Sequence, residues 1–81
     1  MADGMSIQVK IYQLRRIMTP QVDEWSGCIV AAGSEKEARV IANQESKAEG
    51  YVWTDGGLVE SVELGDAKEG VYGLLQSTRE Q

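Results

Sequence analysis

The sequence predicts a two-layer α+β sandwich, in which one helix packs on one face of a four-stranded antiparallel sheet in β-β-α-β-β order. Four segments have the composition of strands, the first and third with apolar residues that alternate with polar ones, and one segment between them carries helix signals. The 81 residues are 42% hydrophobic and 26% charged, which indicates a single globular domain over residues 1–81. Because one helix covers only one face of a sheet, we expect the other face to be uncovered.

The first two strands are predicted within residues 5–17 and over residues 25–32. In the first, apolar residues alternate cleanly with polar ones as far as Ile11. Beyond that point the phase changes, because Tyr12 and Leu14 fall on the face that was polar. Either a bulge resets the register, or both faces of this strand are partly apolar.

A helix is predicted over residues 35–48. Ser34 followed three residues later by Glu37 matches a capping box, which starts helices. Gly50 stands just beyond the end as a C-cap. The helix has a narrow, alanine-rich apolar stripe that allows it to lie close to a sheet, formed by Ala38, Ile41, Ala42 and Ala48.

The segment after the helix looks extended over residues 51–54, and the pattern leaves open whether residues 51–53 add a short strand. Residues 55–57, Asp-Gly-Gly, predict a turn. They do not predict a phosphate-binding loop, because the glycines run into the strand-like "LVESVEL" and no lysine follows closely.

The last two strands are predicted over residues 58–64 and 71–77, joined by a polar loop. Residues 1–5 and 78–81 are expected to fray, as chain ends commonly do.

The residue types that most catalytic and metal sites use are scarce. The chain has no histidine, which removes the commonest general base and metal ligand. Its one cysteine, Cys28, lies in an apolar run and is expected to be a small buried hydrophobe. Glu60 and Glu63 are an odd number of positions apart on a strand, so they point to opposite faces and cannot share a metal ion. We therefore predict no catalytic residue, no cofactor and no metal ligand, and do not expect an enzyme.

The net charge of −5 lies entirely in the C-terminal part of the chain. Residues 1–48 hold six acids and six bases, whereas residues 49–81 hold seven acids and two bases. This acidity disfavours direct nucleic-acid binding and favours a protein partner with a basic surface. No apolar run approaches the roughly 20 residues of a membrane span, and the N-terminus lacks signal-peptide features. We expect the protein to lie in the cytoplasm of a host cell and to have no contact with a membrane.

The aromatic residues are all Tyr or Trp, which are enriched at protein interfaces because each joins an apolar body to a polar tip. Tyr12, Leu14 and some of these aromatics are expected on the uncovered face, although Trp25 and Trp53 fit a small core equally well. Of Glu60 and Glu63, the one that points away from the helix is expected to contact the partner. The candidate partner interface consists of Tyr12, Tyr51, Trp53, Asp55, Glu60, Glu63 and Tyr72.

Four stretches of the chain resemble short proteins encoded by bacteriophages and prophages: "KIYQLRR", "GSEKEARVIAN", "VWTD" and "GVYGLLQS". More loosely, the size, the acidity and the β-β-α-β-β order resemble those of small anti-CRISPR proteins. The resemblance implies an interaction protein that inhibits by binding, and it carries over no functional residue.

Three functions follow as hypotheses. The first is a non-enzymatic inhibitor that occupies a basic, nucleic-acid-handling surface of a host defence complex. The second is a homo-oligomeric structural or assembly protein, which the half-covered sheet and small core motivate. The third is a small-molecule binding or sequestering protein that uses Tyr51 and Trp53 as stacking platforms.

Overall fold

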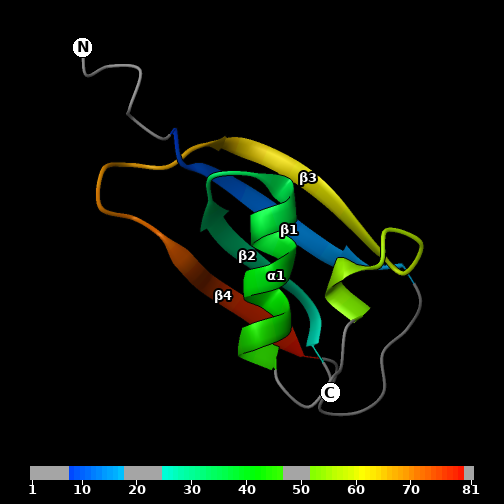
Figure 1. Ribbon diagram of the computed structural model, residues 1–81. Helices are drawn as coiled ribbons and strands as arrows, with labels where there is room; N and C mark the ends of the chain where they lie inside the picture. Colours follow the sequence, from blue (N-terminus) through cyan, green and yellow to red (C-terminus); the bar gives the residue numbers. More distant parts are fainter. Residues whose placement is uncertain (1–7, 18–24, 47–51, 80–81) are drawn as a thin grey trace.

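A computed structural model describes residues 8–17, 25–46 and 52–79 of the chain. Its four strands form one antiparallel sheet in the order β3-β1-β2-β4, and helix α1 lies across one face of it (Figure 1). The predicted α+β fold and its β-β-α-β-β order are confirmed. In chain order the elements are β1 (Lys10–Arg16), β2 (Trp25–Ala32), α1 (Glu35–Ser46), the short 3-10 helix η2 (Val52–Thr54), β3 (Val59–Asp66) and β4 (Gly73–Arg79).

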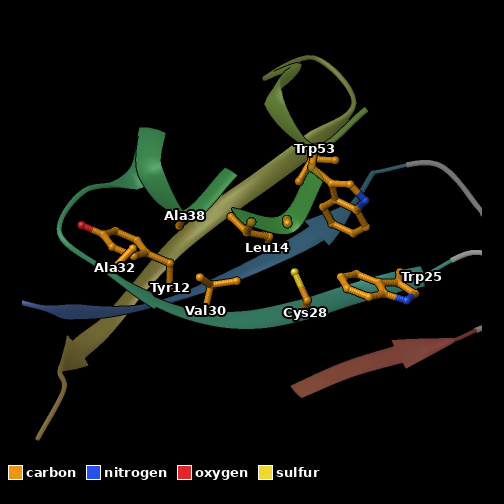
Figure 2. Packing of buried hydrophobic residues seen from close by; sticks show 10 residues of the cluster. Tyr12, Leu14, Trp25, Cys28, Val30, Ala32, Ala38 and Trp53 are labelled. Carbon is orange, nitrogen blue, oxygen red and sulfur yellow. The ribbon is translucent and has the colours of Figure 1, made fainter. Parts of the chain in front are cut away.

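The pairing of β1 with β2 decides which side chains meet the helix. Tyr12 lies opposite Val30 and Leu14 lies opposite Cys28, so these four side chains share one face of the sheet. They point toward α1 and are 7% exposed or less (Figure 2). The expectation that Cys28 is a small buried hydrophobe is confirmed.

The prediction that Tyr12 and Leu14 lie on the uncovered face is wrong. Both faces of β1 are partly apolar, and the helix covers the one that carries these two larger side chains. The bulge lies in β3 instead. Ile11 pairs with Gly65 and Tyr12 pairs with Glu63, so the intervening Leu64 is the bulged residue.

The helix packs closely because the residues it turns toward the sheet are small. Ala38 and Ala42 are fully buried, and they lie in one apolar cluster with Ala32 of β2. The predicted start of the helix is confirmed: the Glu37 amide donates to the Ser34 hydroxyl over 3.1 Å. The Glu37 carboxylate accepts from the Gly33 amide over 2.7 Å, one residue earlier than an ordinary capping box.

Trp53 closes one end of the core. It is fully buried, and its ring centroid lies 6.0 Å from that of Trp25 (Figure 2). Its backbone amide donates to the Asn43 side chain of α1, and its carbonyl accepts from Arg39. The sequence predicts an extended segment over residues 52–54, but they form η2 instead. The side chains of Asn43 and Arg39 in α1 hold its backbone in place.

The other element ends differ from prediction in smaller ways. Thr78 and Arg79 were expected to fray, but they extend β4 because they pair with Gly27 and Trp25 of β2. The predicted fraying of residues 1–5 and 80–81 and the C-cap at Gly50 lie outside the described residues. Within the described ranges, no helix is long and apolar enough to cross a membrane.

We predict that Trp53→Ala lowers the free energy of unfolding by about 3–5 kcal/mol, because it removes a fully buried indole between α1 and the sheet. Urea unfolding followed by circular dichroism measures the change. Leu58→Ala is the control, since Leu58 is 41% exposed in the following turn, and it should cost about 1 kcal/mol or less. Equally small effects of both substitutions would show that Trp53 does not hold the core.

Candidate protein-binding surface

The face of the sheet opposite α1 carries no helix in the part of the chain that the structure describes. Because alternate residues of a strand point to opposite faces, the register identifies the side chains on this uncovered face. It also arranges them in three rows that cross the four strands. The apolar row is Gly65, Ile11, Ala31 and Gly73; the mixed row is Val62, Gln13, Ile29 and Gln76; the polar row is Glu60, Arg15, Gly27 and Thr78.

The middle of the uncovered face is partly apolar and partly open to solvent, because Ile11, Ile29 and Val62 lie around the exposed Gln13. Ala31 is fully buried between its neighbours, and Ile11 and Ile29 are half-buried. Val62, on the edge strand β3, is 49% exposed. Apolar side chains interspersed with polar ones are the usual composition of a protein interface.

An ion pair lies at one end of the uncovered face. The Arg15 guanidinium donates to the Glu60 carboxylate, with Nε at 2.8 Å from Oε2. Their side chains are 69% and 43% exposed, so the pair adds little to stability, as exposed pairs generally do. Its effect is to leave this end of the face polar yet without net charge.

A hollow of about 260 Å³ lies over Gly27 in the polar row. It exists because Gly27 has no side chain between Arg15 and Thr78. A Cβ at that position would lie 2.9 Å from the Leu14 carbonyl oxygen, so the close approach of β1 and β2 requires glycine. The side chains of the uncovered face that line the hollow include Gln13, Arg15, Ile29, Gln76 and Thr78.

The acids of β3 do not form an acidic strand, because β3 pairs with β1 and lies beside its basic residues. Glu60 is paired with Arg15, and the Lys10 amine lies 3.0 Å from Asp66 and 3.4 Å from Glu63. The hydrogen bond to Asp66, together with these negative charges, raises the pKa of Lys10. The acidity of β3 is therefore largely, though not fully, neutralised when the chain folds, because two bases lie beside its three acids.

Two of the predicted interface residues belong to the core. Tyr12 is 7% exposed and Trp53 is fully buried, so neither presents a surface to a partner. For Trp53 and Trp25 the alternative interpretation, that they complete a small core, is the correct one. Tyr51 lies outside the described residues.

The other four predicted interface residues are in different places. Asp55 is in the predicted turn, which is confirmed, and its carboxylate accepts from the Gly57 amide over 2.8 Å. Glu60 lies on the uncovered face and Glu63 on the helix face, as their odd spacing predicted. Tyr72 is 57% exposed, and its hydroxyl donates to Glu37 at the start of α1. Only Glu60 therefore belongs to the surface described above.

Sequence reasoning missed most of the uncovered face, including Gln13, Arg15, Ile29 and Val62. The available signal was the run "CIVAA" in β2, which is apolar at consecutive positions and so places apolar residues on both faces. Among the described residues, no group of three or more Cys, Asp or Glu side chains is placed to hold a metal ion.

The fold and this surface define a small α+β protein whose sheet is covered by a helix on one side. Comparisons of the chain with protein-family models, with curated proteins and with solved structures found no match.

The contact between Tyr72 and Glu37 predicts a specific pH dependence. The hydrogen bond from Tyr72, with a second from the Gly33 amide, lowers the pKa of Glu37, and the same bond raises the pKa of Tyr72. The bond requires an ionised Glu37 and a protonated Tyr72. The stability contributed by Glu37 is therefore present above its unfolded pKa, near 4.5, and is lost as pH falls through the lower folded pKa.

We predict that Tyr72→Phe raises the pKa of Glu37 toward its ordinary value, and carboxyl NMR titration measures that pKa. Glu69→Gln serves as a control near Tyr72 in the chain and should leave the pKa of Glu37 unchanged. An unaltered Glu37 pKa in Tyr72→Phe would show that the Tyr72 hydrogen bond does not set it.

Proposed function

We propose that the protein acts by binding another protein, without catalysis, and that the uncovered face of the sheet makes the contact. The observation that carries this proposal is the group of partly exposed apolar side chains on that face, Ile11, Ile29 and Val62. The polar row borders it with Arg15 and Glu60, which supply directional contacts without a net charge. Burying these apolar side chains against a partner contributes hydrophobic free energy that the isolated chain does not gain.

We further propose that the bound protein belongs to a host defence complex and presents a basic surface that handles nucleic acid. The net charge of −5 supports a basic partner. Because the acids of β3 are paired with Lys10 and Arg15, this support comes from the overall charge, which steers approach. The association rate should therefore fall as salt concentration rises, while the apolar contact is little affected by salt.

The uncovered face also supports the second hypothesis, a homo-oligomeric assembly protein, because a sheet face of this composition can pack on a copy of itself. The third hypothesis, a small-molecule binding protein, loses support. One of its two stacking platforms, Trp53, is fully buried.

We predict that Val62→Lys removes the protein partner, since it places a charge in the apolar part of the uncovered face. Val40→Lys is a matched control, because Val40 is 40% exposed, similar to the 49% of Val62, but lies on α1. Both variants change the same residue type and add the same charge. In affinity capture from bacterial lysate with quantitative mass spectrometry, Val62→Lys should reduce the enriched partner at least about tenfold.

Val40→Lys should capture that partner as well as the unmodified chain does. If Val62→Lys captures it equally well, the uncovered face is not the binding surface. If the captured protein has no basic, nucleic-acid-handling surface, the defence-complex part of the proposal is wrong.

A further inference from the structure

We propose that the uncovered face of the free protein binds a second copy of the chain, so that two sheets stack face to face in a two-fold symmetric dimer. This inference rests on the proposed function, because it assigns an occupant to the same surface. A heterologous partner that binds this face would then displace the second copy.

The size of the face fits a dimer of modest stability. Four strands about 4.8 Å apart and seven or eight residues long, at about 3.4 Å per residue, cover roughly 480 Å². Two such faces bury about 1,000 Å² together, which is at the lower limit of specific protein interfaces. We therefore expect a dimer that forms at high micromolar concentration and dissociates on dilution.

The three rows of the uncovered face restrict how two copies can pack. A two-fold axis that crosses the strands would place the apolar row against the polar row, setting the Arg15–Glu60 pair on Ile11 and Gly65. That arrangement would bury charges against apolar side chains and is unfavourable. An axis parallel to the strands, between β1 and β2, places each row on its own counterpart instead. Near-parallel strands are also the usual geometry of stacked sheets.

On the central strands, the axis parallel to the strands also matches large side chains of the apolar and polar rows with small ones. It sets β1 of each copy over β2 of the other, because β1 and β2 are the two central strands. Ile11 then faces Ala31 of the second copy, and Arg15 faces the hollow over its Gly27. Symmetry makes each match twice, and large-on-small contacts fill space as closely packed interfaces require.

The charge distribution allows the effect of salt concentration to distinguish the dimer from a complex with a basic partner. Within the face, Arg15 and Glu60 balance each other, whereas each chain as a whole carries −5. Two copies therefore repel at long range, and added salt should strengthen the dimer by screening that repulsion. Binding to a basic partner should respond in the opposite direction.

Sedimentation of the purified chain tests the inference. The unmodified protein and Val40→Lys should be dimeric at about 100 µM and dissociate on dilution, and Val62→Lys should weaken the dimer at least about tenfold. In the proposed arrangement Val62 faces Gln76 of the second copy, whereas within one chain these residues lie on opposite edge strands. The double variant Val62→Lys with Gln76→Glu should therefore restore the dimer by forming ion pairs between the copies.

A monomer at about 100 µM overturns the inference. Dimers equally strong in Val62→Lys and in the unmodified chain also overturn it, and failure of the double variant to recover overturns the proposed axis. If the unmodified chain is monomeric but Val62→Lys still loses the captured partner, only the dimer is refuted. A dimer lost in Val62→Lys with unchanged capture would refute instead the proposed partner surface. Far-UV circular dichroism verifies that each variant folds.

Discussion

The arrangement of this protein depends on the packing of the buried Trp53 side chain. Its indole packs beside Trp25 at the start of β2, and the Arg16 guanidinium lies 5.2 Å from its ring centroid. Arg39 of α1 donates to the carbonyls of both Trp53 and Val59, so it ties η2 to the first residue of β3. The helix, the connection and the start of β3 are therefore held at one point of the core.

The position of β3 beside β1 follows from this arrangement and changes the electrostatics of the molecule. Three acids of β3 lie beside two bases of β1, which removes the acidic strand that the sequence alone indicates. Charge in this protein therefore acts mainly through the whole molecule, over distances comparable to the Debye length. Contact free energy has to come from apolar side chains instead, and the uncovered face has them.

The uncovered face also follows from the short length of helix available among the described residues. One helix of 12 residues covers one face of the sheet, and its buried alanines bring it close enough to enclose Tyr12, Leu14 and Val30. The opposite face retains Ile11, Ile29 and Val62 without a cover among the described residues. A small domain gains additional stability when such a face is bound, which links its marginal core to the proposed role in protein binding.

The sequence by itself determined the features that depend on neighbouring residues. These are the β-β-α-β-β order, the cap of the helix at Ser34, the turn at Asp55 and the opposite orientation of Glu60 and Glu63. Capping, turn chemistry and strand alternation each act over a few positions. Only the tertiary structure decided which face of β1 meets the helix and which bases neutralise the acids of β3. The physical reason is that β1 is partly apolar on both faces, and a pair such as Arg15 and Glu60, 45 residues apart, leaves no local pattern in the chain.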